Sequence, residues 1–509
     1  MSRFSGSTDV PVLTADEMRA WDSSTIRRTG IPERVLMETA ARAAASVVDR
    51  LYPHGRVAVA VGSGNNGGDA LVLARTLAAW GRDVIAVQAG SRMPDEALLH
   101  GWRIPVVPAE GAAEAFGGAA TIVDGLLGTG ATGAPREAYA LVIRAMNDSA
   151  RPVVALDGPS GVDLTTGAAP GEAVRAAVTV TFGAPKRGLL LFPGRGLAGR
   201  IVAVEVGFAP REGDAARLIT PAWAHQLLPA VPPDAHKGRM GRVVIVAGRA
   251  GMAGACVLAG TGALRAGAGM AVLVTPEANR VIVQSALPEA LYTDRDTADA
   301  MEVQRGAAAV VAGPAMGTDD DSLAFLDAIA RGSDVPLLLD ADALTLLARD
   351  PGLRERMDRP LLLTPHPGEA GRLLSSSIKE ITADPFAAAA ALAERFRCAV
   401  LLKGTPSLVA ETGRGTRVNV AGHAGLATGG NGDVLGGVIG ALLARGMEPA
   451  DAAAAGLYFS GRAAELAGRG RGLLPTDVAD VLPDALLKVP VPGSSLNLPG
   501  ILLDLPAAV

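Results

Sequence analysis

The sequence predicts an α/β protein built from two domains. Short runs of Val, Ile, Leu and Ala recur along the 509 residues, and each is followed by a loop that carries Gly or Asp. These runs are almost continuously apolar, as the strands of a parallel sheet are when helices cover both of its faces. The length exceeds the roughly 100–200 residues of one domain, and the strand pattern pauses over a Pro-rich stretch at residues 219–238. We therefore expect a three-layer α/β domain over residues 1–215 and a second α/β domain over residues 225–488.

Two helices precede the first strand of the first domain. Thr14 and Glu17 have the spacing of a capping box, which marks the start of a helix, and residues 33–51 have a helical pattern. Buried strands are then expected over residues 56–61, 83–88, 121–123, 152–156, 178–182 and 201–206.

The second domain shows the same alternation of apolar runs and Gly- or Asp-bearing loops. Apolar runs are found at residues 242–247, 270–275, 308–312, 335–339, 360–363 and 399–402. A helix is expected over residues 434–446, directly after a Gly-rich loop. The segment 489–509 has Pro and Gly at irregular intervals, and we expect it to be a poorly ordered tail.

Composition and charge exclude several classes of protein. The 47 basic and 52 acidic residues give a net charge of -5, so neither nucleic acid nor an anionic membrane is an expected partner. Aromatic residues make up only 3% of the chain, which disfavours a stacking platform for single strands. Cys256 and Cys398 lie far apart and lack metal-ligand spacing, so they are expected to be reduced thiols. No apolar run reaches the ~18 residues of a membrane span, and we expect a soluble, cytoplasmic protein.

Residues 62–69 form a Gly-rich loop between the first strand and the helix that follows it. Glycines at this place let backbone amides approach a phosphate, and the helix dipole favours an anion there. A tight turn without a ligand would also use Gly. The loop further carries Asn65, Asn66 and Asp69, which a turn does not need, so ligand binding is the favoured interpretation.

Other polar residues of this domain also follow predicted strands. Asp124 and Asp157 each end a strand and precede a Gly-bearing loop, and Lys186 follows another strand. The carboxyl ends of parallel strands form the ligand crevice of an open α/β sheet. Each Asp alone could cap a helix instead, but together these residues predict one binding site.

The motifs VGSGNNGGDALVLARTL, IVDGLLGTG, LDGPSGVD and TFGAPKRGLLLFPG resemble the NAD(P)H-hydrate epimerase domain of the bifunctional NAD(P)H-hydrate repair enzymes, a Rossmann-like domain. Ala70 and Gly158 replace the Gly and Ile that are more frequent in the family. The resemblance implies that the hydrated nucleotide contacts Asn65, Asn66, Gly67, Gly68, Asp69, Gly128, Thr129, Gly130, Ala131, Thr132, Gly133, Ala134 and Asp157. It also implies potassium ligands at Asn66, Asp124 and Ser160, which suit a hard cation. Our hypothesis is that Asp157 performs acid–base chemistry with the help of Lys186.

The second domain carries the most specific motif of the chain. Residues 428–433 read Thr-Gly-Gly-Asn-Gly-Asp at the start of a predicted helix. Small residues there expose backbone amides that can hold a transferring phosphoryl group, and Asp433 is placed to take a proton from an attacking hydroxyl. A Gly-rich helix start without chemistry is the alternative. The pattern is similar to that of the ribokinase-like fold, whose members phosphorylate small hydroxyl compounds.

The longer motifs HKGRMGRVVIVAGRAGMAGACVLAGTGALRAGAGMAVLVTP, AGPAMG, LLLDADAL, TPHPGE, LLKG and LATGGNGDVLGG resemble the ADP/ATP-dependent NAD(P)H-hydrate dehydratases, over most of residues 234–446. His423 and Ala424 depart from the usual Asn-Pro. The resemblance implies contacts of Ala255, Gly317, His366 and Asp433 with the hydrated dinucleotide. It implies contacts of Lys403, Gly404, Thr405, Pro406, Ser407 and Gly432 with ADP or ATP. Mg²⁺ would bridge the nucleotide phosphates, with Asp340, Asp342 and Glu369 as candidate outer ligands.

The two resemblances imply one function, the repair of hydrated NADH and NADPH. The first domain would interconvert the R and S epimers of the hydrates NADHX and NADPHX at C6. The second would dehydrate the S epimer with ADP (or ATP), giving NAD(P)H, AMP (or ADP) and phosphate. We expect a homo-oligomer that binds these small molecules. Two alternatives stay open: a hydroxymethylpyrimidine-type small-molecule kinase fused to a nucleotide-binding module, and a first domain that only binds.

Overall fold

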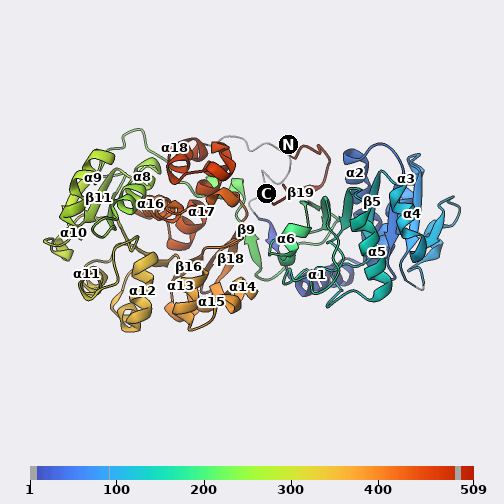
Figure 1. Cartoon of the computed structure of the whole chain (residues 1–509), viewed down its shortest axis with the longest axis horizontal. Helices are drawn as coiled ribbons and strands as arrows, with labels where there is room; N and C mark the ends of the chain where they lie inside the picture. Colours follow the sequence, from blue (N-terminus) through green and yellow to red (C-terminus); the bar gives the residue numbers. More distant parts are fainter. Residues whose placement is uncertain (1–8, 91, 488–493, 509) are drawn as a thin grey trace. The chain divides into compact units, whose positions relative to one another are not determined.

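The computed structural model of the chain describes residues 9–90, 92–487 and 494–508. It divides into two compact units, one formed by residues 1–216 with 491–509 and the other by residues 217–490 (Figure 1). Each unit contains a largely parallel sheet between layers of helices. In the described ranges no helix combines the length and apolarity that crossing a membrane requires.

The sheet of the first unit has one antiparallel edge strand, β19, and is otherwise parallel. Its strands run in the order β19 (Ile501–Leu505), β8 (Arg200–Val204), β7 (Val178–Phe182), β6 (Val153–Leu156), β5 (Thr121–Gly125), β2 (Val57–Val61), β3 (Val84–Gln88) and β4 (Val106–Pro108). The strands β3 and β4 follow β2 on one side of it, and β5 to β8 follow on its other side. Strand order therefore reverses between β2 and β5, where the adjacent carboxyl ends leave a crevice.

Helices cover both faces of this sheet, as the apolar strands predict. Alternate residues of β2 point to opposite faces, with Val57, Val59 and Val61 in one apolar core and Ala58 and Ala60 in another. The first core includes α2 (Glu33–Leu51) and α3 (Asn65–Ala79), and the second includes α4 (Ala112–Gly117) and α5 (Glu137–Asp148). The helix α1 (Ala15–Thr29) begins at the predicted capping box: the amide of Glu17 donates to Thr14 Oγ1 and the amide of Thr14 to Glu17 Oε2.

The C-terminal segment differs from the sequence prediction. We expected a poorly ordered tail over residues 489–509, but residues 501–505 form β19, which pairs antiparallel with β8 from Ile501↔Val204 to Leu505↔Ile201. The guanidinium of Arg200 holds both carboxylate oxygens of Asp504, at 2.7 and 2.6 Å. Residues 501, 503 and 505 are buried in alternation, a strand pattern that the surrounding Pro and Gly obscured. Residues 489–493 and 509 lie outside the described ranges.

The second unit contains the larger sheet. Its strands run in the order β9 (Ala216–Leu218), β18 (Arg414–Asn419), β17 (Ser407–Glu411), β16 (Ala399–Leu402), β15 (Leu361–Leu363), β14 (Leu337–Leu339), β13 (Ala309–Ala312), β10 (Arg242–Val246), β11 (Met270–Thr275) and β12 (Leu291–Asp294). Every pair from β16 to β12 is parallel, and β17 is antiparallel to both neighbours. Strand order reverses between β10 and β13, so the second unit repeats the crevice of the first.

Two layers of helices cover this sheet (Figure 1). One layer contains α7 (Pro221–Leu227), α8 (Ala253–Arg265), α16 (Asn431–Ala444), α17 (Pro449–Ala467) and α18 (Pro475–Leu486). The other contains α11 (Asp320–Arg331), α12 (Ala341–Arg349), α13 (Pro367–Leu374) and α15 (Pro385–Phe396). The helices α8 and α16 approach so closely that a Cβ at Gly437 would lie 1.9 Å from the carbonyl oxygen of Ala259. This contact sets the positions of both helices, and α16 begins in the predicted phosphate motif.

Replacement of Gly437 by Ala should therefore destabilise the second unit. Ala favours an isolated helix over Gly by roughly 1 kcal/mol, but the backbone contact leaves no room for a methyl group. We expect the free energy of unfolding to fall by about 1–3 kcal/mol, the usual cost of overpacking, measured by urea denaturation. Gly254→Ala in α8 is the matched control, because a Cβ there meets nothing within 4 Å. Equal free energies of unfolding for the two variants would contradict the close contact between α8 and α16 at Gly437.

Candidate active sites

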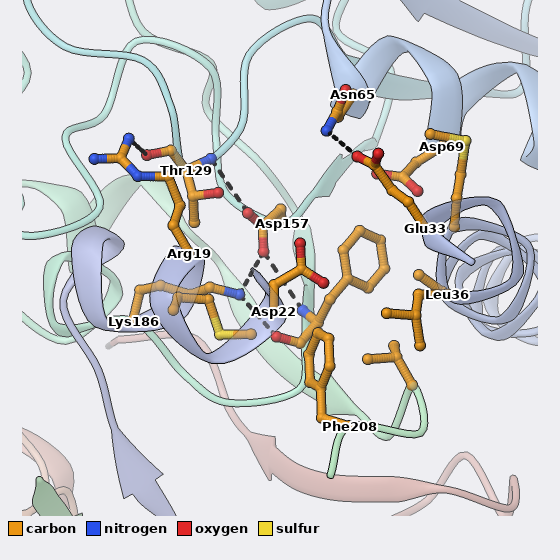
Figure 2. Close-up of a pocket in the computed structure, with 15 residues that line it drawn as sticks. Arg19, Asp22, Glu33, Leu36, Asn65, Asp69, Thr129, Asp157, Lys186 and Phe208 are labelled. Atoms are coloured by element: carbon orange, nitrogen blue, oxygen red, sulfur yellow. Dashed lines mark hydrogen bonds and ion pairs between the residues drawn. The ribbon is translucent and has the colours of Figure 1, made fainter. Parts of the chain in front are cut away.

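A pocket in the first unit collects residues from seven segments of the chain (Figure 2). Its cavity volume is about 150 Å³. The polar lining residues are Arg19 and Asp22 of α1, Glu33 of α2, Asn65 and Asp69 of α3, and Thr129, Asp157 and Lys186 of the loops after β5, β6 and β7. The apolar lining is formed by Met18, Leu36, Met37, Ala40, Phe182, Val206 and Phe208. The pocket thus joins a charged strand-end surface to an apolar wall made mainly by helices.

A buried ion pair forms the floor of this pocket. Lys186 is 1% exposed, and its Nζ lies 2.5 Å from Asp157 Oδ1. The ammonium also donates to Thr181 Oγ1 and to the carbonyl oxygen of Phe182, both at 2.9 Å, so its three donors are all engaged. The amide of Thr129 donates to the other oxygen of Asp157 at 3.3 Å. These contacts hold the carboxylate in one orientation, with the predicted pair brought together.

The backbone of Asp157 supports a functional interpretation. Its φ of 65° lies in the left-handed region, which is uncommon for a residue with a side chain and recurs at functional sites. The amide of Asp157 donates to Val180 O at 2.7 Å, so the strained residue is held by the neighbouring strand.

The other predicted nucleotide contacts are distributed unevenly. Asn65, Asp69 and Thr129 line the pocket, whereas Gly130 and residues 132–134 are exposed beside it. Asn66, Gly67 and Gly68 are buried in the first turn of α3. A Cβ at Gly67 would lie 2.0 Å from the carbonyl oxygen of Gly62. Backbone packing alone therefore explains that glycine.

Sequence reasoning missed the acidic helix residues of the pocket. Asp22 and Glu33 line it together with Asp69, and Glu33 Oε1 accepts a hydrogen bond from Asn65 Nδ2 at 2.7 Å. Burial raises the pKa of Asp69 well above its usual value, and the nearby charges of Asp157, Asp22 and Glu33 raise it further. Burial, Glu33 and Asp157 also raise the pKa of Asp22. No local motif marks Asp22, because only the packing of α1 turns it toward the strand ends.

The three predicted potassium ligands lie together beneath this pocket. Ser160 Oγ donates to Asp124 Oδ1 at 2.6 Å, and the amide of Ser160 donates to Asp124 Oδ2 at 2.8 Å. Asn66 and Ser160 both hydrogen-bond Leu127, through its carbonyl oxygen and its amide respectively, at 2.9 Å. Asn66 Oδ1 is buried and has no partner in the described ranges. Burial raises the pKa of Asp124 to about 6, against the effect of its hydrogen bonds to Ser160 and Leu126. The cluster therefore contains an unsatisfied amide oxygen of Asn66 and a desolvated carboxylate of Asp124, which are linked through Leu127 and Ser160.

The second site is built around the first turn of α16. Gly430 caps the helix with a φ of 95°, and Asp433 follows in the first turn. Lys403, just after β16, forms an ion pair with Asp340, just after β14, at 2.6 Å. A Cβ placed on Gly432 would lie 3.8 Å from both Lys403 Nζ and Asp340 Oδ2. The structure thus places Lys403 and Gly432 close together beside Asp433, and it shows Asp340 as the partner of the lysine.

Electrostatics distinguish Asp433 from an ordinary surface carboxylate. Burial and the charge of Asp340 raise its pKa to about 7, although the ammonium of Lys403 lowers it. The charge of Asp433 also reaches the neighbouring helix α8, where it and, more strongly, burial raise the pKa of Cys256 to about 12. Cys256 follows Ala255, one of the predicted dinucleotide contacts. A carboxyl group with a pKa near neutrality is suited to general base catalysis.

Asn431 is another residue that sequence reasoning did not single out. Its Nδ2 donates to the carbonyl oxygens of Leu426 and Thr428 at 3.1 and 3.2 Å, and its Oδ1 is buried without a partner among the described residues. The side chain closes the loop that leads into α16. The motif already contained this Asn, but only the structure shows that it braces the backbone.

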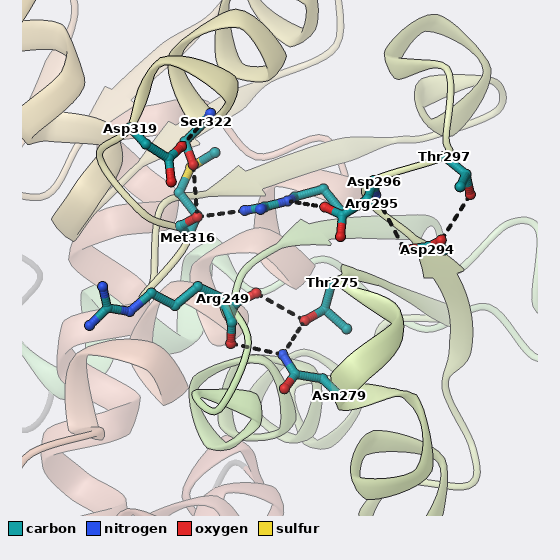
Figure 3. Close-up of polar contacts among 11 residues, drawn as sticks. Arg249, Thr275, Asn279, Asp294, Arg295, Asp296, Thr297, Met316, Asp319 and Ser322 are labelled. Atoms are coloured by element: carbon teal, nitrogen blue, oxygen red, sulfur yellow. Dashed lines mark hydrogen bonds and ion pairs between the residues drawn. The ribbon is translucent and has the colours of Figure 1, made fainter.

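Two further strand-end loops, which precede the predicted contacts Ala255 and Gly317 in the sequence, meet through backbone hydrogen bonds. The amides of Gly248 and Arg249 donate to the carbonyl oxygens of Pro314 and Ala315 at 2.8 and 2.6 Å. Figure 3 shows Asn279 and Thr275 bracing the first loop and Arg295 bracing the second through Met316 O. The amide of Gly317 donates to Asp342 Oδ2 at 2.9 Å.

His366 has a structural role that sequence reasoning did not predict. Its Nδ1 accepts hydrogen bonds from the amides of Gly368 and Glu369, and its own amide donates to Glu369 Oε2 at 2.8 Å. It therefore caps α13. The loop of Lys403–Ser407 is closed by Ser407 Oγ, which accepts from the amide of Gly404 and donates to its carbonyl oxygen.

Comparisons with known proteins agree with this geometry. Residues 33–188 match the family model described as YjeF-related protein N-terminus, and residues 243–484 match the model described as NAD(P)H-hydrate dehydratase. The chain is 38% identical over 486 residues to the bifunctional NAD(P)H-hydrate repair enzyme of Escherichia coli, covering 92% of this chain and 93% of that one. It is 37% identical over 472 residues to the Coxiella burnetii enzyme of the same name, covering 88% and 94%.

A solved structure also resembles part of the chain. The ADP/ATP-dependent NAD(P)H-hydrate dehydratase of Bacillus subtilis, crystallised with ATP and Mg²⁺, is 29% identical and covers 52% of this chain and 95% of its own, with a TM-score of 0.47. The predicted fold class, two α/β domains each built on a largely parallel sheet, is confirmed, and the strand order β4-β3-β2-β5-β6-β7 of the first unit is Rossmann-like. At this identity and coverage, the chain belongs to the family of bifunctional NAD(P)H-hydrate repair enzymes.

Proposed function

We propose that the first unit interconverts the C6 epimers of hydrated NADH and NADPH and that the second unit dehydrates the S epimer with ADP or ATP. The observation that carries the second activity is the carboxyl group of Asp433, with its pKa near 7, in the first turn of α16 beside Lys403 and Asp340. The pocket floored by Asp157 and Lys186 supports the first activity.

The dehydration follows from the arrangement around α16. A hydroxyl is a poor leaving group, and phosphorylation converts it into a good one. Asp433 takes the proton of the C6 hydroxyl as its oxygen attacks the terminal phosphorus of the nucleotide, and the phosphorus–oxygen bond to the rest of the nucleotide breaks. Lys403 and the first-turn amides hold the negative charge of the transferring group. Phosphate then leaves C6 with the bonding electrons, C5 loses a proton, and NAD(P)H with AMP or ADP results.

Mg²⁺ would bridge the nucleotide phosphates and neutralise their charge. The carboxylates considered for outer ligands already accept hydrogen bonds: Asp340 from Lys403 and the Ala341 amide, Asp342 from the Gly317 amide, and Glu369 from the His366 amide. The nucleotide would therefore supply most of the ligands of the ion.

The test of both activities is to give the purified protein a mixed-epimer NADH hydrate with ADP or ATP and Mg²⁺, and to follow the near-ultraviolet absorbance of dihydronicotinamide. Full recovery with release of phosphate supports the proposal. No recovery, or a stable phosphorylated product, would contradict the dehydratase. Recovery that stops near the share of one epimer would contradict the epimerase only. Asp433→Asn should abolish recovery, whereas Asp320→Asn, an exposed first-turn acid of α11, should not.

The pH dependence of dehydration should report Asp433. The group acts as a base only when ionised, so single-turnover rates at saturating nucleotide should rise with pH through about 7 and level off above it. Lys403→Met should shift this inflection to higher pH, because the ammonium lowers the pKa of Asp433. An unshifted inflection in that variant would contradict the coupling of the two groups.

Loss of the buried lysine should separate the two activities. In Lys186→Met, Asp157 loses its ion-pair partner, which typically costs about 3–5 kcal/mol in a buried pair. We expect a lower unfolding temperature and no epimerisation, while the S epimer is still dehydrated by the second unit. The double variant Asp157→Asn/Lys186→Met should regain stability but not epimerisation. Recovery of both epimers by either variant would exclude a role for the pair in the reaction.

We further propose that Asn66, Asp124 and Ser160 bind potassium. The buried Asn66 Oδ1 has no partner in the described part of the chain, and Leu127 and Ser160 link Asn66 to the Asp124 carboxylate; these oxygen donors fit a hard monovalent cation. Bound K⁺ would supply positive charge that orders the loops around Asp157.

Potassium should therefore stabilise the first unit. At constant ionic strength, replacing choline with K⁺ should raise its unfolding temperature and its epimerisation rate. Asn66→Ala should lose both responses. Asn66→Asp loses the two hydrogen bonds that the Asn66 amide donates but keeps a side-chain oxygen for the cation. This variant should therefore retain both responses to K⁺. A thermal response equal in wild type and Asn66→Ala would contradict this site.

A further inference from the structure

The helix α1 forms a wall of the first-unit pocket that none of the strand-end motifs predicted. Met18, Arg19 and Asp22 line the cavity from this helix. Met18 and Asp22 are four residues apart and so lie on the same helical face. The position of Asp22 therefore depends on how α1 is attached to the sheet.

Hydrogen bonds of a residue just before α1 and of a side chain within it attach the helix to loops that follow the strands of the sheet. The amide of Leu13 donates to Pro185 O at 3.1 Å, and the amide of Arg187 donates to Leu13 O at 2.7 Å. Trp21 Nε1 donates to Ala209 O at 2.8 Å. The helix is thus joined directly to the segment that carries Lys186, which holds Asp22 at a defined place opposite the ion pair.

Asp22 is half-buried and has no hydrogen bond or ion pair within the described ranges. Asp22 and Asp157 both line the pocket shown in Figure 2, whose apolar wall includes Phe208, and the charge of Asp157 acts on Asp22. Four other acidic or basic groups face the same cavity: Glu33 from α2, Asp69 from α3, and Arg19 and Lys186. Of the two cations, Lys186 is committed to Asp157, and Arg19 forms an ion pair with the exposed Asp16.

The two aspartates of the pocket have different surroundings. Asp157 has an ammonium at 2.5 Å. Asp22 is bonded to no cation among the described residues, and burial, Glu33 and Asp157 raise its pKa. Two carboxyl groups in one site whose environments differ in this way are suited to act as an acid and a base.

We propose that Asp22 is a second catalytic residue of the first unit, which exchanges a proton with the C6 hydroxyl on the side opposite Asp157. This inference rests on the proposed epimerase function. Asp22 gives its proton to the hydroxyl oxygen, the C6–O bond breaks with both electrons on oxygen, and water forms. The lone pair of the ring nitrogen makes a C6=N1 bond, and the resulting cation is stabilised by the surrounding carboxylates.

Inversion is completed from the other face. A water molecule forms a new bond to C6, the C6=N1 electron pair returns to nitrogen, and Asp157 accepts the surplus proton. Solvent then returns a proton to Asp22 and removes one from Asp157. In the opposite direction the two aspartates exchange roles, as microscopic reversibility requires.

The test compares Asp22→Asn with wild type, using the full chain. The amide keeps the shape of the side chain and cannot exchange the proton. We expect the kcat of epimerisation to fall at least about 100-fold, with KM changed less than about threefold and dehydration of the S epimer unchanged. Asp22→Glu should retain part of the activity. Asp16→Asn, an exposed acid on the same helix, is the matched control and should epimerise normally.

Two further readouts distinguish catalysis from a structural role. The epimerisation rate of the wild type should decline at high pH, where Asp22 loses its proton. The residual activity of Asp22→Asn should show no such decline. In water enriched in ¹⁸O, each inverted molecule should carry the label at C6. Retention of ¹⁶O, or normal kcat in Asp22→Asn, would overturn the inference. A wild-type protein that does not epimerise would overturn the proposed function itself.

Discussion

Both sites depend on the same constraint, a reversal of strand order in a parallel sheet. In the first unit β3 and β5 lie on opposite sides of β2, and in the second β11 and β13 lie on opposite sides of β10. The loops that leave the two central strands must therefore diverge, and the space between them admits a ligand. Backbone hydrogen bonds bridge each crevice at its base, from the amide of Gly62 to Gly125 O and from the amide of Gly248 to Pro314 O.

Each unit places a Lys–Asp ion pair at its site, fully buried in the first unit and with a partly exposed lysine in the second, but the pairs act differently. In the first unit the paired Asp157 is itself the proposed base, and Lys186 is almost completely buried. In the second unit the pair of Lys403 and Asp340 lies beside the base, and its two members change the pKa of Asp433 in opposite directions. Desolvation is costly for such pairs, which makes their retention at strand ends an indication of function rather than of stability.

Much of the fold and of the strand-end chemistry was predictable. Asp157, Lys186, Lys403 and Asp433 follow apolar runs or begin a helix, and the structure brings each together with its expected neighbours. The tail was mispredicted because β19 is short and gains its partner β8 from a segment about 300 residues earlier. The residue pattern of a short segment does not show that it pairs with a strand so far away in the sequence.

The sequence by itself determined the residues that end strands, because the alternation of apolar runs with Gly-bearing loops is local and a parallel sheet gathers strand ends at one edge. Only the tertiary structure decided which side chains face these residues from other elements. Asp22 reaches the first pocket through the attachment of α1 to Pro185 and Arg187, and Asp340 reaches Lys403 through the alignment of β14, β15 and β16. The physical reason is that burial and neighbouring charge set the pKa of Asp22 and Asp433, and both quantities depend on packing between segments far apart in the chain.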